Sequence, residues 1–230
     1  MVFSSPAVSG GIVYVDSLEG NVIALNASTG ALIWNYTTAD VVFSSPAVVG
    51  GVVYVGSDDG KVYAFGVHDV AVTNVASRTV VGQGFNASIN VTVANQGGYS
   101  ETCKITVYAN ATIVGSQNIT VSAGDSLAVT FTWNTSGCLA YDNYTISAYD
   151  SPVAGEMNTA NNNCTGGCVI VTKPGDINGD FKVDLKDLVK LTNAYGSKPG
   201  DANWNQNADI DGNGTVGLSD LVILAQHYGQ

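Results

Sequence analysis

The stretch DINGDFKVDLKD, residues 176–187, places an oxygen-bearing side chain at nearly every second position. The same arrangement returns 33 residues later as DIDGNGTVGLSD, residues 209–220. In a 12-residue loop that wraps one calcium ion, the ligands come from positions 1, 3, 5, 7, 9 and 12, with the backbone carbonyl used at position 7. Both stretches follow this spacing, so the sequence predicts a pair of EF-hand-like calcium loops.

The predicted ligands of the two loops are nearly the same set. In the first loop they are Asp176, Asn178, Asp180, Asp184, Asp187 and the carbonyl of Lys182. In the second they are Asp209, Asp211, Asn213, Asp220 and the carbonyl of Thr215, while Gly217 at position 9 leaves its place to water. Hard oxygen ligands in a flexible set suit Ca²⁺ better than Mg²⁺, which demands tighter octahedral geometry. We therefore expect two calcium ions.

A short amphipathic helix is predicted after each loop. The apolar residues Leu185, Leu188, Val189, Leu191 and Tyr195 recur, with the same offset of 33, as Leu218, Leu221, Val222, Leu224 and Tyr228. Such matching stripes at helical spacing predict one core shared by the two helices.

The duplicated unit of loop and helix resembles a type I dockerin module across residues 175–230. The Asp at position 12 of both loops, the closing AYG and HYG, and the linking NWNQNADI carry the resemblance. It implies calcium-dependent binding to a cohesin domain of another protein. It also implies that positions 10 and 11 face the cohesin, which are Leu185 with Lys186 and Leu218 with Ser219.

Two departures from the dockerin pattern bear on these expectations. Phe181 stands at position 6 of the first loop, where the family has the glycine of a sharp turn, so a strained or rearranged loop is predicted. The recognition pairs are not of the Ser-Thr type, which leaves the identity of the cohesin open.

The first 66 residues contain a repeat with a period of 40, because VFSSPAV at 2–8 recurs at 42–48. Each copy leads through a Gly pair into an alternating strand (IVYVDS, VVYVGS), an acidic turn and a second strand (NVIALN, KVYAFG). Short antiparallel strands with a period near 40 predict propeller blades. The first copy carries on into ALNASTGALIWNY, while the second stops at Phe65-Gly66.

These blades resemble those of quinoprotein-like propellers. The resemblance covers blade architecture and brings no cofactor-binding or catalytic residue with it. A propeller closes with roughly four to eight blades, so one and a half blades predict that the chain begins partway through an array. Because the strands would expose an apolar face and unpaired edges, we expect them to find a partner within the chain or outside it.

Residues 67–172 change to longer alternating strands, from HDVAVTNV to CVIVT. Alternation places Ile89, Val91 and Val93 on one face of a strand, and Val129, Phe131 and Trp133 on one face of another. About seven such strands predict an immunoglobulin-like β-sandwich of two sheets. The region resembles the cell-adhesion-related (CARDB) domain of bacterial and archaeal surface proteins through VVGQGFNASINVTVANQG and NTANN. The predicted fold is therefore a mainly β multidomain chain with partial propeller blades at 1–66, a sandwich at 67–172 and a calcium module at 173–230.

All four cysteines lie in the predicted sandwich: Cys103, Cys138, Cys164 and Cys168. Scattered thiols without a nearby His are poor zinc ligands, so disulfides are preferred. Three connectivities are possible. We favour Cys164 with Cys168 across a tight turn, and Cys103 with Cys138 across the sandwich.

Charge and sequons indicate the compartment. Only 8 Lys and Arg stand against 19 Asp and Glu, which is too few to neutralise a phosphate backbone, so nucleic acid is not expected as a partner. No apolar run is long enough for a membrane helix, and no signal peptide precedes the first repeat, which predicts a fragment or processed form. Four cysteines, few lysines and ten Asn-x-Ser/Thr sequons together predict an extracellular or cell-surface glycoprotein. The sequons are at Asn26, Asn35, Asn86, Asn90, Asn110, Asn118, Asn134, Asn143, Asn163 and Asn213.

No catalytic group is expected, because His68 and His227 are too isolated for a triad or a metal cluster. The first hypothesis is a non-catalytic extracellular scaffolding protein whose calcium module docks it onto a cohesin-like partner. An alternative is a subunit of a calcium-stabilised extracellular filament that assembles with neighbouring copies of itself. A third is the C-terminal part of a larger quinone-dependent or polysaccharide-degrading enzyme complex.

Overall fold

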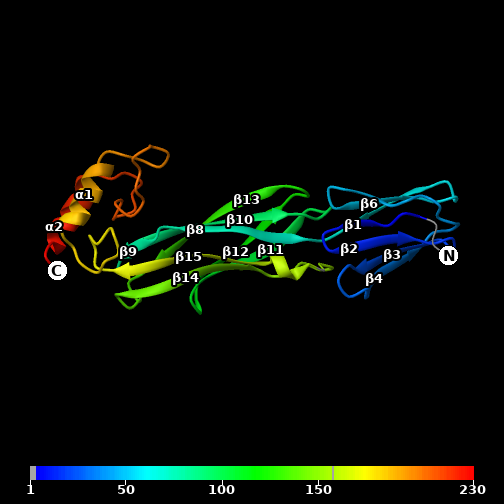
Figure 1. Cartoon of the computed structure of the whole chain (residues 1–230), viewed down its shortest axis with the longest axis horizontal. Helices are drawn as coiled ribbons and strands as arrows, with labels where there is room; N and C mark the ends of the chain where they lie inside the picture. Colours follow the sequence, from blue (N-terminus) through cyan, green and yellow to red (C-terminus); the bar gives the residue numbers. More distant parts are fainter. Residues whose placement is uncertain (1–3, 157) are drawn as a thin grey trace.

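The computed structural model describes residues 4–156 and 158–230. Three parts follow one another along an elongated molecule: two small sheets, a β-sandwich and a helical module (Figure 1). The amino terminus lies at the end formed by the small sheets, and the carboxyl terminus lies at the opposite end beside the helices. Val2 and Phe3, where the first copy of the repeat begins, lie outside the described residues.

The repeat forms two antiparallel sheets. Sheet A has the order β1 (Ala7–Ser9), β2 (Ile12–Asp16), β3 (Asn21–Asn26), β4 (Leu32–Thr37), and sheet B has the order β5 (Ala47–Val49), β6 (Val52–Gly56), β7 (Val62–Gly66). The predicted short strands with tight turns are confirmed. Sheet B lacks the counterpart of β4, because the chain leaves it after Gly66 for the sandwich.

The two sheets pack face to face around one core. Ile12, Tyr14, Val22 and Ala24 of sheet A meet Val53 and Val55 of sheet B, and all six are buried. Rings from the outer strands close the same interface. Trp34 of β4 lies 5.1 Å from the ring of Phe65 in β7, and Tyr36 lies 5.4 Å from Tyr63.

The sandwich consists of a three-stranded and a five-stranded sheet, in the orders β13-β10-β8 and β12-β11-β14-β15-β9. Its strands are β8 (Val70–Ser77), β9 (Val80–Gly82), β10 (Asn86–Asn95), β11 (Glu101–Ala109), β12 (Thr112–Val121), β13 (Ser126–Asn134), β14 (Asp142–Asp150) and β15 (Asn163–Thr172). The two-sheet sandwich is confirmed, with eight strands in place of about seven. The added strand β9 has three residues and pairs in parallel with β15, so it is too short to show an alternating pattern.

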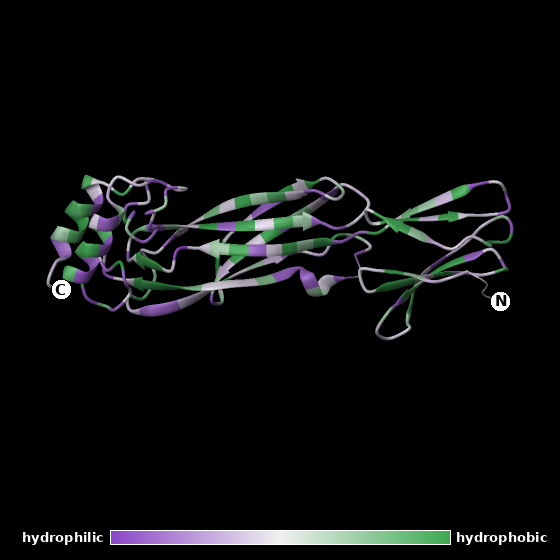
Figure 2. Ribbon diagram, turned by 45° about the horizontal axis from the view of Figure 1, so that its top comes forward, coloured by the Kyte–Doolittle hydropathy of each residue, from purple (hydrophilic) through white to green (hydrophobic). Residues whose placement is uncertain are grey.

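The alternation predicted for the sandwich strands matches their register. On β10 and β13, Ile89 stands opposite Phe131 and Val91 opposite Val129. These side chains are buried, and the intervening Asn90, Thr130 and Thr132 are exposed. The ribbon in Figure 2 shows the same alternation as bands of hydrophobic and hydrophilic residues along the strands. The sandwich core is therefore the period-two core that the sequence predicts.

Both predicted disulfides are wrong, because all four cysteines are free. Cys164 and Cys168 lie on the single extended strand β15 instead of flanking a tight turn. Residues four apart on a strand are separated by about 13 Å, which is beyond the span of a disulfide. Cys103 lies beside Asp150 at the end of β14, whereas Cys138 lies beside Tyr144 near the start of the same strand. Those two thiols are therefore at opposite ends of the sandwich.

The helical module contains α1 (Leu185–Ala194) and α2 (Leu218–His227). Leu191 and Leu224 are buried in a shared core with Ile177, Val183 and Val216. The predicted sharing of whole apolar stripes is wrong, because the equivalent pairs Leu185/Leu218, Val189/Val222 and Tyr195/Tyr228 are exposed. Neither helix is long and apolar enough to cross a membrane, and the same holds across the described residues.

Candidate metal centre

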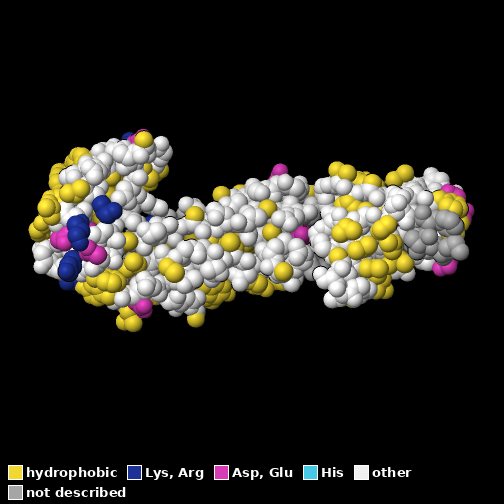
Figure 3. Space-filling view, viewed as in Figure 1, with side chains coloured by type: hydrophobic (Ala, Val, Ile, Leu, Met, Phe, Trp, Pro, Cys, Tyr) yellow, Lys and Arg dark blue, Asp and Glu magenta, His cyan; other side chains and the backbone are white. Residues whose placement is uncertain are grey.

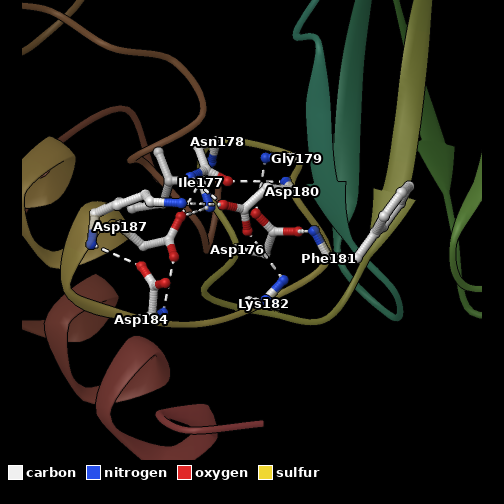
Figure 4. Close-up of polar contacts among 10 residues, drawn as sticks. Asp176, Ile177, Asn178, Gly179, Asp180, Phe181, Lys182, Asp184 and Asp187 are labelled. Carbon is white, nitrogen blue, oxygen red and sulfur yellow. Dashed lines mark hydrogen bonds and ion pairs between the residues drawn. The ribbon is translucent and has the colours of Figure 1, made fainter.

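The first loop leaves strand β15 through Pro174 and folds around the carboxylate of Asp176. This carboxylate is almost fully buried and accepts hydrogen bonds from the backbone N–H of Gly179 at 2.7 Å and of Phe181 at 2.9 Å. The hydroxyl of Thr172, the last residue of β15, donates to it at 2.7 Å. Figure 4 shows Asp176 with Gly179 and Phe181 in the loop. The start of the loop is thereby tied to the end of the sandwich.

Asp187, at position 12, ties the end of the first loop to its beginning. Its side chain is fully buried, and Oδ1 accepts hydrogen bonds from the N–H groups of Ile177 at 2.8 Å and Asn178 at 3.1 Å. Oδ2 accepts from the N–H of Asp184 at 2.9 Å. Asp184 in turn accepts from the N–H of Lys186 at 2.8 Å and caps helix α1. The predicted ligand at position 9 therefore serves as a helix cap in this structure.

Positions 3 and 5 of the first loop are linked to each other. The Asn178 amide donates to Oδ2 of Asp180 at 3.0 Å. The ammonium of Lys186 lies 3.0 Å from that same oxygen. Lys182 is exposed, and its N–H donates to Oδ1 of Asp180 at 3.2 Å. Position 11 thus supplies a cation next to a predicted calcium ligand.

The second loop repeats this arrangement with a tighter group of carboxylates. Oxygens of Asp209, Asp211 and Asp220 all lie within 4.8 Å of one another. Asp209 accepts from the N–H of Gly214 at 3.0 Å, and Asp220 accepts from the N–H groups of Ile210 and Gly217 at 2.7 and 2.8 Å. The side chain of Asn213 donates to Asp211 at 2.8 Å and accepts from the N–H of Thr215 at 2.9 Å. The structure brings all the predicted side-chain ligands of this loop together.

Position 6 has the same backbone conformation in both loops despite the different residues. Gly214 has φ of 84°, and Phe181 has φ of 69°. A residue with a Cβ in this left-handed region costs about 1–2 kcal/mol, so the prediction of strain at Phe181 is confirmed, while the turn itself is kept. The phenyl ring packs edge-on against Tyr141 of the sandwich at 5.5 Å. This contact offsets part of the strain.

Burial and like charge act together on the first ligand of each loop. Burial raises the pKa of Asp176, and Asp187 adds to the effect. Burial also raises the pKa of Asp209, with further contributions from Asp220 and Asp211. Several carboxylates held this close favour a bound cation, and the donors are all oxygens. The residues therefore fit calcium, which would be held by the side-chain oxygens of each loop.

Arg78, a sandwich residue that contacts the second loop, was not among the site residues predicted from the sequence. Its guanidinium is buried and donates to the carbonyl oxygens of Gln206 and Asp209. Burial lowers the pKa of Arg78, while Asp209, Asp220 and Asp211 raise it. Nearby, the side chain of Asn207 accepts from the N–H of Val80 at 3.2 Å. These contacts join residues 127 to 131 positions apart, which no local motif can reveal.

The residues predicted to face a partner lie on the outer surface of the helices. Leu185 is 62% exposed and Leu218 is 66% exposed, and Lys186 and Ser219 are also exposed. Four further side chains extend this surface, and they fall into equivalent pairs: Val189 with Val222, and Tyr195 with Tyr228. We call these eight residues the helix surface.

Three protein-family models match the chain in the order expected from the sequence. The model described as outer membrane protein assembly factor BamB matches residues 2–96, that of CARDB matches residues 67–166, and that of the dockerin type I domain matches residues 174–227. Dockerin type I domains bind calcium and mediate calcium-dependent assembly with cohesin partners. Dockerin and CARDB domains are non-catalytic and typical of extracellular or surface proteins. No curated protein matches the chain.

Solved structures resemble a part of the chain. The crystal structure of the CARDB domain of the PF1109 protein from Pyrococcus furiosus, in complex with di-metal ions, is 27% identical over 46% of this chain and 89% of that chain, with a TM-score of 0.39. A β-glucosidase from Listeria innocua in complex with glucose is 13% identical over 49% of this chain and 16% of that chain, with a TM-score of 0.34.

Proposed function

We propose that this chain is a non-catalytic extracellular scaffolding protein whose C-terminal module binds two calcium ions and docks onto a cohesin-like domain of another protein. The module is proposed to occupy residues 173–230, with the sandwich at 67–172 and the blades at 1–66 acting as spacer and contact modules. The observation that carries the proposal is the duplication itself. Two oxygen-lined loops lead into two helices that expose the same apolar positions.

In this proposal the loop carboxylates of the module bind the ions, and the exposed helix residues bind the partner. Calcium supplies the positive charge that lets the carboxylates of each loop remain close together. Asp187 and Asp220 orient the loops by accepting backbone N–H bonds from both ends. Because each of them also bonds to the residue just before its helix, the loops fix where α1 and α2 begin. The positions of Leu185 and Leu218 therefore depend on the loops.

Ion binding is tested by calorimetry on the full chain with Ca²⁺. We expect two ions for the wild type and one for Asp209→Asn, since this change removes the charge of one of the three carboxylates, Asp209, Asp211 and Asp220, that lie close together in the second loop. Asp201→Asn, in the exposed linker between the loops, is the matched control and should keep two ions. A wild-type chain that binds no calcium would contradict the proposal.

Partner binding is tested separately with immobilised type I cohesin domains. Leu185→Asp and Leu218→Asp place a charge on the helix surface, so retention in calcium should fall for each and more for the double variant. Ile113→Asp, on an equally exposed sandwich residue, is the control. Equal retention of the double variant and the control by the cohesin that holds the wild type would refute the assigned surface.

A second candidate is a subunit of a calcium-stabilised filament that assembles with copies of itself. The uncovered faces of sheets A and B support it, as argued below. The third expectation, a part of a larger quinone-dependent or polysaccharide-degrading enzyme, remains a prediction. Sequencing of the gene region upstream tests it, because it requires further blades and catalytic residues there.

Glycosylation also remains a prediction of an extracellular location. Asn26 is half-buried, and the other nine sequon asparagines are exposed. Asn213 is a special case, because its side chain belongs to the second calcium loop. Mass spectrometry of the natural protein should therefore find glycans at some of the other sites and an unmodified Asn213.

A further inference from the structure

Each of the two small sheets has two chemically distinct faces. One face of sheet A carries Ile12, Tyr14, Val22 and Ala24, and we call it the tyrosine face. The other carries Val8, Val13, Val15, Ile23 and Leu25, and we call it the valine face. With the period of 40, the tyrosine face of sheet B consists of Val52, Tyr54, Val62 and Ala64, and its valine face of Val48, Val53, Val55, Tyr63 and Phe65.

The contact between the two sheets joins unlike faces. The tyrosine face of sheet A is buried against the valine face of sheet B, which contributes Val53, Val55 and Phe65 to their common core. The second sheet is therefore related to the first by repetition, in the manner of consecutive blades. The two sheets are not related by a two-fold axis, which would bring the same face of each sheet together.

Repetition leaves one face of each kind uncovered. On the valine face of sheet A, Val8 is 66% exposed and the neighbouring Leu32 is 63% exposed, while Val13, Val15, Ile23 and Leu25 are half-buried. The tyrosine face of sheet B is exposed as well, with Val62 at 75% and Tyr54 at 42%. Hydrophobic side chains gather over these sheets in the space-filling view (Figure 3). The strands of both faces present mainly apolar residues and tyrosine and no charged side chain, and the polar residues Asn21, Asn35 and Thr37 lie toward one end of the valine face of sheet A. An uncovered apolar surface of this kind is unusual for a free surface.

We propose that the valine face of sheet A packs against the tyrosine face of sheet B in a second copy of this chain. The occupant follows from the internal contact, in which the tyrosine face of β2 and β3 packs on a valine face. Sheet B offers the equivalent tyrosine-face positions on β6 and β7, without a counterpart of β4. This inference deepens the filament candidate and does not depend on calcium docking. Because it joins two different surfaces, the contact leaves a free face at each end of a pair.

Repeated addition of copies has two geometric outcomes. If the rotation between successive sheets closes, two to four copies make a ring of four to eight blades, the range of known propellers. If it does not close, the copies form an open array. Both outcomes require the same contact between unlike faces. In both, the molar mass measured by light scattering exceeds that of one chain.

The experiment uses two variants of the full chain, each of which blocks one face. Val8→Lys with Leu32→Lys blocks the valine face of sheet A, and Tyr54→Lys with Val62→Lys blocks the tyrosine face of sheet B. All four residues are exposed, so the changes should cost little folding stability. Ile113→Lys with Leu139→Lys, on exposed sandwich residues, is the control.

Light scattering after size exclusion is measured in EGTA, so that calcium docking does not contribute. We expect the wild type and the control to run as multiples of 23.7 kDa, and each blocked variant to run as a monomer. An equimolar mixture of the two blocked variants should form a dimer and stop there, because one compatible pair of faces remains. Circular dichroism checks that each variant is folded.

The results distinguish association through the two sheet faces from association through the helix surface and from no association. A wild type that stays monomeric up to high concentration overturns the proposal, as does a mixture that remains monomeric while the wild type associates. Assembly that occurs only in calcium, and that the Leu185→Asp/Leu218→Asp variant loses, would assign it to the helix surface and contradict this inference. The proposed calcium docking would survive every one of these results.

Discussion

Lys186 and Ser219 hold the same position in the two proposed calcium loops and affect the neighbouring predicted ligand differently. The ammonium of Lys186 lies 3.0 Å from Asp180, so a calcium ion in the first loop would have to compete with a positive charge. The hydroxyl of Ser219 accepts from the Asn213 amide at 3.3 Å and brings no charge. The first loop should therefore be the weaker calcium site.

Exchange of these two residues should move the two affinities in opposite directions. Lys186→Ser is expected to tighten the first site and Ser219→Lys to weaken the second, each by up to about fivefold, because exposed ion pairs contribute only modest free energy. Calorimetry on each variant measures the change. Lys190→Ser, one turn further along α1 and exposed, controls for net charge. An unchanged first site in Lys186→Ser would show that the ion pair is irrelevant once calcium binds.

Asp150 gives the sandwich a pH dependence of defined sign. Burial raises its pKa from 3.8 to about 6, so the folded state binds the proton more tightly than the unfolded state. The carboxyl group has no effect on the free energy of unfolding below pH 3.8, and it lowers that free energy progressively as the pH rises to 6. Ionised Asp150 therefore costs the sandwich up to about 3 kcal/mol at neutral pH.

Asp150→Asn removes this charge and should stabilise the sandwich at pH 7 but not at pH 4. Denaturant unfolding gives the free energy of unfolding of wild type and variant at each pH. The difference between the two proteins is compared at pH 4 and pH 7, because the contributions of all other titrating groups cancel in that difference. Asp142→Asn, exposed on the same strand, should show no such difference. A variant that gains the same stability at pH 4 as at pH 7 would contradict the linkage.

At the scale of secondary-structure elements, the long sandwich strands were predictable and the short or irregular ones were not. The face of β13 was predicted, because Val129, Phe131 and Trp133 alternate with polar residues and are buried. The first half of β15 was missed, since NCTGGC reads as a turn. It is held extended by β14, with Cys164 opposite Ala148 and Thr165 opposite Ser147. That tertiary pairing also made the predicted disulfide impossible.

The candidate site was predictable in its ligands and not in its surroundings. The spacing of Asp209, Asp211 and Asp220 is a local property of the chain, so the sequence alone finds it. Arg78 reaches the second loop only because the sandwich end packs against the helical module. The exposed stripes on α1 and α2 were also misassigned, because periodicity locates an apolar face without saying which of its residues a small core can hold.

Arg78 connects the sandwich to the second loop through hydrogen bonds to the backbone carbonyls of Gln206 and Asp209. Arg78→Met should lower the free energy of unfolding of the helical module by about 1.5–3 kcal/mol, because the carbonyls of Gln206 and Asp209 lose a charged donor. Thermal unfolding in calcium measures it, with Lys104→Met on the exposed side of β11 as the control. An unchanged transition in Arg78→Met would mean that the two modules are energetically independent.

For the whole molecule, removal of calcium should affect one end only. EGTA is expected to reduce the helical signal in circular dichroism and to lower the midpoint temperature at which the helical module unfolds. The reason is that the loop carboxylates repel one another once calcium is removed. The sandwich has its own core, from Val70 to Val171, and should keep its transition. A single transition that shifts as a unit with calcium would show that the chain unfolds cooperatively from end to end.

The two connections of the sandwich enter and leave it at opposite ends. β8 begins at the end next to the small sheets, and β15 ends next to the helical module (Figure 1). The two strands belong to different sheets of the sandwich and run in the same direction in facing sheets. A tensile force between the two ends of the chain therefore acts along these strands. It loads the hydrogen bonds of β8 with β10 and of β15 with β14 in shear, so that many bonds must break together before the sandwich yields. The arrangement suits a mechanical tether.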